Sequence, residues 1–232
     1  MSDEIHLGPL EGRLFDAVIF DMDGTLIDST PAVERSWVVW AQHYGVSAED
    51  LAHSHGMPSA SIVAKLIPEP DRAAAKQFID DLEVADTDDI VPLPGAVEAL
   101  SALDDDRRAI ATSCHRSLME ARVAASGIPR PAVIVTVDDV TRGKPNPDPF
   151  LLAAQRLGLD PSRCLVVEDA PSGLTGARAA GCATLSVVTT TAREHLHADA
   201  IVTDLSQVML VQTEAGVRLS AAPSDVDERV RS

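Results

Sequence analysis

The chain alternates short apolar runs with longer stretches of helical periodicity. Runs rich in β-branched residues occupy positions 16–20, 109–112, 133–137, 164–168 and 184–188, with a weaker run at 200–203. These runs are continuously apolar rather than alternating, which is typical of parallel strands covered by helices on both faces. Because helical patterns separate them, the sequence predicts an α/β fold built on one parallel sheet.

The gap between the first two runs is too long for a single crossover helix. It contains helical patterns of its own at 32–44 and 73–84, and these predict an inserted helical domain. Proline-containing turns mark its borders. We therefore expect a discontinuous core domain of residues 1–29 and 95–222, a helical cap domain of residues 30–94, and a flexible tail of residues 223–232.

The charge balance narrows the classes of partner. The formal net charge is −17, and such an acidic chain is poorly suited to neutralising the phosphates of nucleic acid or binding anionic lipid. No apolar run approaches the ~20 residues that span a bilayer, and the N-terminal MSDEIHLGPL lacks the layout of a signal peptide. We expect a cytoplasmic enzyme, either a monomer or a weak homodimer, without nucleic-acid or membrane partners.

Two carboxylates follow the first predicted strand, in the sequence DMDGTLIDS at 21–29. Asp21 and Asp23 could divide the work of phosphoryl transfer, one attacking phosphorus and the other moving a proton. Gly24 would relax the turn so that the N–H groups of Met22 and Asp23 approach phosphate oxygens. A polar turn that leaves a strand would need the same residue types, so this motif does not decide the function alone.

Two later motifs offer groups that bind a phosphoryl oxygen. The second run ends in Thr112 and Ser113, a hydroxyl followed by an N–H, and Lys144 precedes a proline-rich turn in RGKPNPDPF. A stiffly held lysine would orient the nucleophile and balance charge on the transferring group. Each motif also has an ordinary interpretation, as a β-branched strand end and as a solvated loop lysine.

A pair of consecutive carboxylates ends the fourth run, in LVVEDAPSG at 165–173. Burying both Glu168 and Asp169 at the end of so apolar a strand would be costly without a cation. Mg²⁺ commonly takes one or two carboxylates and completes its coordination with water and substrate phosphate, so Asp169 with Asp21 would suffice. The alternative is a helix N-cap at Asp169 with an exposed Glu168.

Taken together, these four motifs resemble the haloacid dehalogenase-like hydrolase superfamily over nearly the whole chain. The resemblance implies a Rossmann-like parallel sheet with a small helical cap inserted after the first strand. It implies that Asp21 is the nucleophile, Asp23 the general acid and base, and Thr112 and Lys144 the remaining catalytic residues. The metal set that it implies is Asp21, Asp23, Glu168 and Asp169, for Mg²⁺, while Met22 and Ser113 would contact substrate.

More narrowly, DSTPAVERSW, VPLPGAVEAL and VVEDAPSGLTGARAAGC resemble bacterial sugar and hexitol phosphatases and fungal glycerol- and 2-deoxyglucose-phosphate phosphatases. This similarity implies hydrolysis of a small phosphorylated metabolite through an aspartyl-phosphate. The cap loop HGMPSAS supplies His55, Met57 and Ser59 as candidate substrate contacts.

Three alternatives remain open within and beyond this resemblance. A β-phosphoglucomutase-like mutase would use a cap arginine for a second phosphate, and HGMPSAS has none, although Lys65 or Arg72 could compensate. A haloalkanoate dehalogenase does not need magnesium ligands, so Glu168 and Asp169 argue against it. A regulator without activity could lose the nucleophile or the lysine, yet both are present.

The cysteines form no recognisable set. Cys114, Cys164 and Cys182 are odd in number and widely spaced, which fits neither a disulfide framework nor a paired zinc site. Small core residues are the ordinary interpretation. Because Cys114 closely follows Thr112, we also consider whether its oxidation could inactivate the enzyme.

Overall fold

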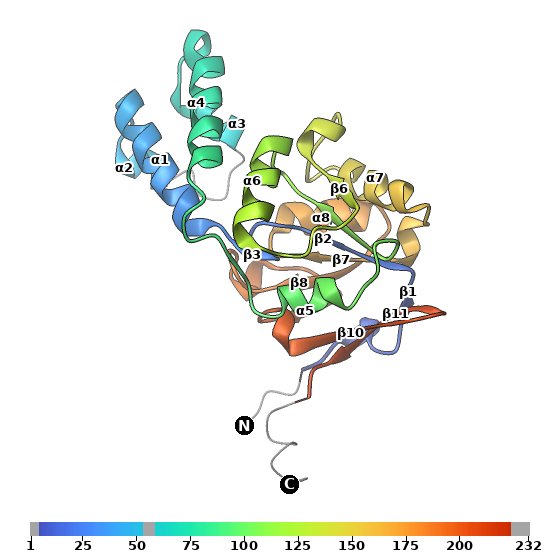
Figure 1. Cartoon of the computed structure of the whole chain (residues 1–232). Helices are drawn as coiled ribbons and strands as arrows, with labels where there is room; N and C mark the ends of the chain where they lie inside the picture. Colours follow the sequence, from blue (N-terminus) through green and yellow to red (C-terminus); the bar gives the residue numbers. More distant parts are fainter. Residues whose placement is uncertain (1–4, 53–58, 224–232) are drawn as a thin grey trace.

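A six-stranded parallel sheet forms the centre of the computed structural model, which describes residues 5–52 and 59–223 (Figure 1). Its strand order is β6-β5-β2-β7-β8-β9, and every neighbouring pair is parallel. The strands are β2 (Ala17–Phe20), β5 (Arg108–Ala111), β6 (Val133–Val135), β7 (Cys164–Glu168), β8 (Ala183–Val187) and β9 (Ala200–Val202). All six runs predicted from the sequence are strands, which confirms the α/β fold class.

Helices bury both faces of this sheet. The side chains of β2 alternate between two apolar clusters, with Val18 and Phe20 on one face and Ala17 and Ile19 on the other. The first cluster contains residues of α5 (Ala96–Ser101) and α6 (Arg116–Ser126), and the second contains residues of α7 (Asp148–Leu157) and α8 (Pro171–Ala179). Burial on both sides explains the continuous apolarity of the strands.

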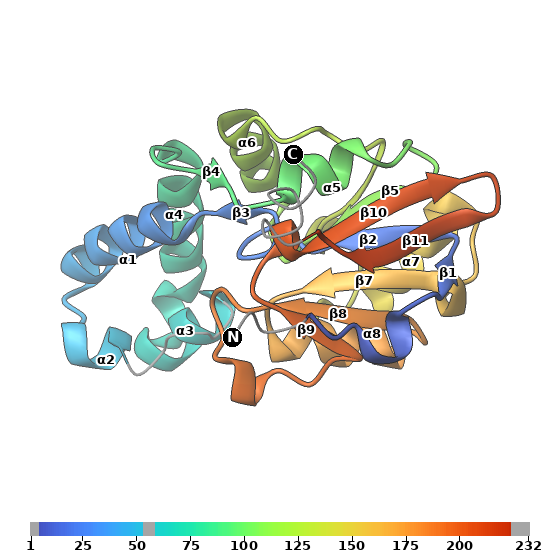
Figure 2. The same ribbon diagram turned by 90° about the horizontal axis from the view of Figure 1, so that it is seen from below.

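A small antiparallel sheet adds to the first face. Its order is β1 (Leu14–Phe15), β11 (Gly216–Ala221) and β10 (Val208–Thr213). Figure 2 shows it lying across the strands of the large sheet, and Val217 and Leu219 join the same apolar cluster as Val18 and Phe20. Short 3-10 helices connect the elements of the fold at Gly8–Leu10, Glu69–Asp71, Val137–Asp139, Pro161–Arg163, Arg193–His195 and Leu205–Gln207.

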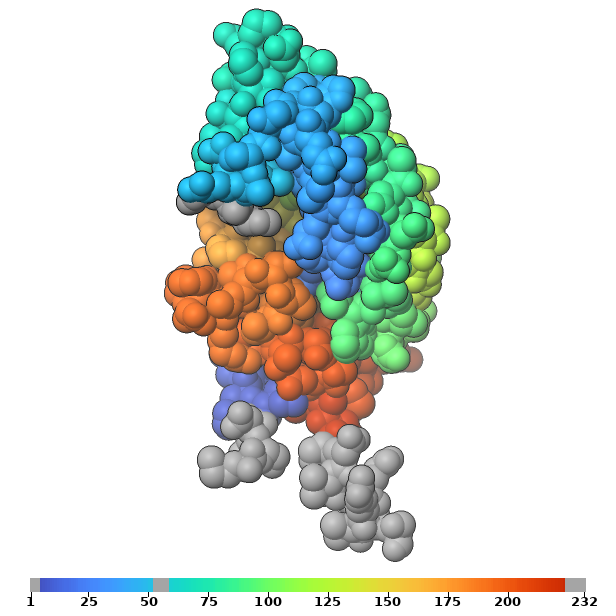
Figure 3. Space-filling view, turned by 90° about the vertical axis from the view of Figure 1, so that its left-hand side faces the viewer, coloured from blue at the N-terminus to red at the C-terminus, as the bar shows by residue number. Residues whose placement is uncertain are grey.

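The segment after β2 folds as a separate group of helices beyond one end of the sheet (Figures 1 and 3). Its helices are α1 (Thr30–Tyr44), α2 (Ala48–Ala52), α3 (Ser59–Leu66) and α4 (Arg72–Ala85). They share an apolar core of their own, in which the fully buried Trp40 donates a hydrogen bond from Nε1 to the Ala75 carbonyl over 2.8 Å. Across residues 5–52 and 59–223, no helix has the length and apolar character needed to cross a bilayer.

Two short strands connect this helical group to the sheet. β3 (Ile27–Asp28) leads into α1, and β4 (Val91–Pro92) returns from α4. The two strands pair antiparallel, and the Leu93 N–H continues the ladder by bonding the Leu26 carbonyl over 2.9 Å. Entry and exit therefore lie side by side, and we keep the name cap for the helical group that they carry.

Candidate active site

Three adjacent strands, β5, β2 and β7, end at one edge of the sheet and bring predicted residues together. Asp21 directly follows β2, Thr112 follows β5, and Glu168 ends β7, with Asp169 next to it. Because parallel strands present their carboxyl ends at a common edge, side chains distant in sequence meet there. Asp21, Glu168 and Asp169 are all buried, and each offers an oxygen within 4.8 Å of the others.

Lys144 reaches this carboxylate cluster from the loop before α7. Its Nζ donates to Asp21 Oδ1 and, over 2.7 Å, to Glu168 Oε1, while its side chain is only 5% exposed. Burial alone would lower the pKa of Lys144, but the Asp21 and Glu168 carboxylates more than offset this effect and raise it. The lysine therefore stays charged beside the oxygen that the sequence assigns to nucleophilic attack.

Backbone groups and a close glycine fix the Glu168 side chain. Its Oε2 accepts hydrogen bonds from the N–H groups of Asp169 and Ala170, over 3.0 and 3.1 Å. A Cβ at Gly173 would lie 1.6 Å from Glu168 Oε1, so only glycine fits against this carboxylate. Glu168 is thus fixed where one of its oxygens contacts Lys144, and it also belongs to the acidic cluster with Asp21 and Asp169.

A loop after β8 holds the Asp169 side chain. Thr190 Oγ1 donates a hydrogen bond to Asp169 Oδ2, and Thr189 Oγ1 lies 3.5 Å from the same oxygen. Gly24 has a φ of +81°, and a Cβ there would lie 2.3 Å from Asp169 Oδ2. The turn after Asp21 and the metal-ligand candidate Asp169 are therefore packed directly together, which accounts for glycine at position 24.

The cluster carries more negative charge than Lys144 balances. Burial raises the pKa of Asp21 well above its usual value despite the Lys144 ammonium, and the Glu168 and Asp169 carboxylates raise it further. Burial and then the neighbouring Glu168 carboxylate raise the pKa of Asp169 to about 7. A hard divalent cation would relieve both effects, since it favours the ionised forms. The residues present thus fit a Mg²⁺ ion.

We expect the apparent affinity for Mg²⁺ to increase as the pH rises through about 7, the raised pKa of Asp169. A protonated carboxyl does not bind a cation, so below the raised pKa of Asp169 each tenfold rise in proton concentration weakens binding by up to about tenfold. Conversely, stability of the metal-free protein should decrease as pH rises through this range, because the folded state holds these protons more tightly than the unfolded chain. Thermal unfolding over a range of Mg²⁺ concentrations, repeated at several pH values, measures both the affinity for Mg²⁺ and the stability of the metal-free protein. Binding that does not depend on pH would contradict the prediction.

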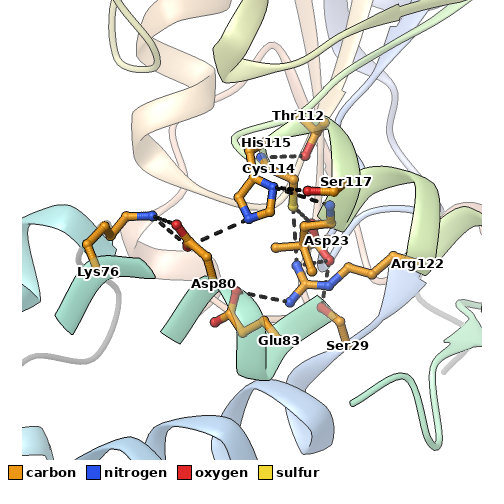
Figure 4. A network of polar contacts seen from close by, with 11 residues as sticks. Asp23, Ser29, Lys76, Asp80, Glu83, Thr112, Cys114, His115, Ser117 and Arg122 are labelled. Carbon is orange, nitrogen blue, oxygen red and sulfur yellow. Dashed lines mark hydrogen bonds and ion pairs between the residues drawn. The ribbon is translucent and has the colours of Figure 1, made fainter. Parts of the chain in front are cut away.

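Asp23 lies beside this cluster and has its own partners. Its Oδ1 accepts from Ser29 Oγ over 2.7 Å and from Arg122 Nη1 over 2.9 Å, and its Oδ2 accepts from Cys114 Sγ over 3.0 Å (Figure 4). Three donors from three segments therefore define where this carboxylate points. Such restraint suits a group that must meet one oxygen of a substrate.

The other predicted contacts differ in what they can offer. Thr112 is buried, and its Oγ1 accepts from the Cys114 N–H over 3.1 Å, so the hydroxyl proton remains for a ligand, while the Ser113 side chain is exposed. The Met22 side chain is fully buried in the core, which leaves only its backbone for a phosphate. Ser59 is half-buried at the start of α3. His55 and Met57 lie outside the described residues.

The cysteines are buried thiols, which argues against oxidation of Cys114. Burial and then the Asp23 carboxylate raise the pKa of Cys114 well above its usual value, and burial raises those of Cys164 and Cys182 to about 12. Since the thiolate is the reactive form, we expect a chromogenic disulfide reagent to titrate no thiol promptly in the native protein and all three after unfolding in guanidinium. A fast native thiol that disappears in Cys114→Ser would contradict this interpretation.

Sequence reasoning missed several residues around the site. Thr189 and Thr190 belong to a run of threonines that begins two residues after the end of β8, and this position near a strand end was the available signal. Arg122 occupies the same face of α6 as the buried Leu118, Met119 and Val123. A cation on the apolar face of a helix was the signal there.

The sequence is similar to a family of hydrolases and to named phosphatases. A model described as haloacid dehalogenase-like hydrolase matches residues 15–181. The chain is 43% identical over 175 residues to hexitol phosphatase A of Escherichia coli K12, covering 73% of this chain and 81% of the relative. It is 35% identical over 191 residues to glycerol-1-phosphate phosphohydrolase 2 of Saccharomyces cerevisiae, covering 75% of each chain.

Solved structures show the same architecture. The crystal structure of a hydrolase from Pseudomonas syringae superposes with a TM-score of 0.72 at 26% sequence identity. The match covers 82% of this chain and 94% of the other. The fold of most of this chain therefore recurs in another hydrolase.

Proposed function

The chain belongs to the haloacid dehalogenase-like hydrolases, and from this premise we propose that it is a Mg²⁺-dependent phosphatase of small sugar, hexitol or polyol phosphates. The observation that carries the proposal is the buried contact of Lys144 with Asp21 beside Asp169. A nucleophile, its counter-ion and a metal ligand share one buried edge of the sheet. This combination suits in-line attack on a phosphate monoester.

In the first half-reaction, an Asp21 oxygen attacks phosphorus and the bond to the sugar oxygen breaks. Asp23 gives its proton to that leaving oxygen. Asp21, Asp169 and the backbone carbonyl of Asp23 would hold the Mg²⁺ ion, which supplies charge compensation for the phosphate when bound. Thr112, the N–H of Ser113 and Lys144 hold the equatorial oxygens throughout.

In the second half-reaction, water attacks the phosphorus of the aspartyl-phosphate. Asp23, now ionised, takes the proton of that water, and the bond between Asp21 and phosphorus breaks to release inorganic phosphate. Both half-reactions therefore use the same carboxylates, and Asp23 returns to its starting form. Placement of the cap above this edge would limit entry of bulk water until the intermediate has formed.

The names of the relatives support the proposed substrate class. Hexitol phosphatase A and glycerol-1-phosphate phosphohydrolase 2 are named for phosphorylated polyols. Of the two residues that could compensate for a cap arginine in a mutase, Arg72 donates from Nε to the Ile67 carbonyl within the cap itself. The regulator alternative is weakened because the nucleophile and its lysine are in contact. A cytoplasmic location, the domain borders and a monomer or weak homodimer stay predictions.

Phosphate release from a panel of sugar, hexitol and glycerol phosphates tests the proposal. We expect release that needs Mg²⁺, stops with EDTA and is fastest for polyol phosphates, because these are the substrates of the relatives. Release by the metal-free protein at the same rate would contradict the metal assignment. No release from any ester, combined with conversion of glucose 1-phosphate in the presence of its bisphosphate, would establish the mutase instead.

A further inference from the structure

Cap helix α4 meets core helix α6 through charged side chains. Asp80 and Glu83 lie one turn apart on α4, and both face α6 (Figure 4). His115 Nε2 lies 3.7 Å from Asp80 Oδ1, and Arg122 Nη2 lies 3.6 Å from Glu83 Oε2. Asp80 and Glu83 belong to the acid-rich segment 80–89, whose composition predicts a solvated surface, yet these two carboxylates contact the core.

The Arg122 guanidinium connects the cap to the candidate acid–base group. One arm, Nη1, donates to Asp23 Oδ1 over 2.9 Å, and the other arm, Nη2, faces Glu83. The Arg122 side chain is 5% exposed and that of Glu83 11%. A planar fork with donors on two sides is the geometry by which arginine bridges two carboxylates, and lysine cannot reproduce it.

The charges of Arg122 and Asp23 both act on Glu83. Burial raises the pKa of Glu83, the Arg122 cation opposes this shift, and the Asp23 carboxylate adds to it. Without the guanidinium, two carboxylates would face each other across a largely buried space. A change in the position of Glu83, which moves with α4, would therefore alter the balance of forces on Arg122 and on Asp23.

We propose that Arg122 is a positioning residue, which fixes the Asp23 carboxylate for proton transfer and makes that placement depend on Glu83 of the cap. The inference rests on the proposed acid–base role of Asp23 and extends it to a contact between cap and core. With the cap seated against α6, the guanidinium is shared by both carboxylates. With α4 displaced, Arg122 loses one partner, and Asp23 loses a restraint on its orientation.

The choice of leaving group separates this role from a purely structural one. A hexitol alkoxide needs a proton as it leaves, whereas p-nitrophenolate is stable without one, so only the hexitol ester depends on a well-placed acid. We expect Arg122→Gln to lower kcat/KM for a hexitol phosphate by roughly tenfold to a hundredfold, and that for p-nitrophenyl phosphate by about threefold or less. Most of the loss should appear in kcat rather than KM.

Matched variants isolate the proposed contact. Arg130→Gln removes a cation whose pair with Glu120 is about half exposed. This variant should leave kcat/KM for both substrates unchanged. Glu83→Gln should reproduce part of the substrate-dependent loss, whereas Asp81→Asn, an exposed site on the same helix, should not. Arg122→Lys should recover part of the loss, because it restores the charge without the fork.

Asp23→Asn serves as the reference for every outcome. If Asp23→Asn shows the leaving-group effect and Arg122→Gln does not, the inference is overturned while the proposed function stands. The same holds if Arg122→Gln lowers kcat/KM equally for the hexitol phosphate and for p-nitrophenyl phosphate. If Asp23→Asn itself shows no leaving-group effect, the acid–base role fails and the inference falls with it. If Arg122→Gln folds poorly, the comparison of Glu83→Gln with its control Asp81→Asn tests the inference instead.

Discussion

Replacing Asp21 with asparagine should abolish turnover of every phosphate ester while leaving the fold intact. An amide cannot attack phosphorus as a carboxylate does, and loss of a covalent nucleophile removes roughly four orders of magnitude or more in kcat. The substitution should change the stability of the metal-free protein little, because Lys144 keeps its contact with Glu168 and because burial already disfavours the charge of Asp21 by raising its pKa. Steady-state phosphate release and thermal unfolding measure the two effects separately.

Asp28→Asn is the matched control for this variant. Asp28 belongs to the same sequence motif, but its Oδ1 accepts from the Thr30 N–H at the start of α1. We expect a modest loss of stability of about 1 kcal/mol or less from the weakened contact, with activity retained. An Asp21→Asn variant that keeps a measurable fraction of wild-type kcat would remove Asp21 from the nucleophilic role.

The second large effect is expected at Lys144. Lys144→Met removes the ammonium that contacts both Asp21 and Glu168, and it leaves these buried carboxylates without that partner. Breaking a buried ion pair from one side costs about 3–5 kcal/mol, and loss of charge stabilisation in the transition state costs roughly two to three orders of magnitude in kcat. Urea unfolding and phosphate release in saturating Mg²⁺ give both quantities.

Arg130→Met provides the comparison for an exposed cation. Its pair with Glu120 is about half exposed on both sides, so its removal should change stability by about 1 kcal/mol or less. Equal stability losses in Lys144→Met and Arg130→Met would mean that the contacts of Lys144 are no stronger than a surface pair. Full activity in Lys144→Met would remove it from the phosphate site.

Much of this site could be predicted because its signals are local in sequence. Asp21, Thr112 and Glu168 each stand at the end of an apolar run, and parallel strands place such ends at one edge. Lys144 was predicted from a local signal as well, because its proline-rich motif directly precedes α7, a helix that packs on this sheet. The strand limits differ from expectation by one or two residues only, because burial on both faces makes each run continuous.

The contact between cap and core could not be predicted in the same way. Arg122, Glu83 and Asp23 come from three separate elements, and nothing in the spacing of these residues indicates that α4 packs against α6. The acidic run containing Glu83 resembles a solvated surface, and only tertiary packing shows which of its carboxylates turn inward. The environment of Cys114 is equally a property of packing, because its neighbours Asp23 and Arg122 are distant in sequence.

Trapping the phosphorylated enzyme tests the central claim most directly. The enzyme would be mixed with a hexitol phosphate and Mg²⁺, quenched in acid within one turnover, reduced with borohydride to convert an acyl phosphate into an alcohol, and mapped by peptide mass spectrometry. We predict a quenched protein heavier by one phosphoryl group, with the reduction product located at Asp21 and absent from Asp21→Asn. Turnover without any phosphorylated protein, or a phosphoryl group on another residue, would contradict the aspartyl-phosphate mechanism at Asp21.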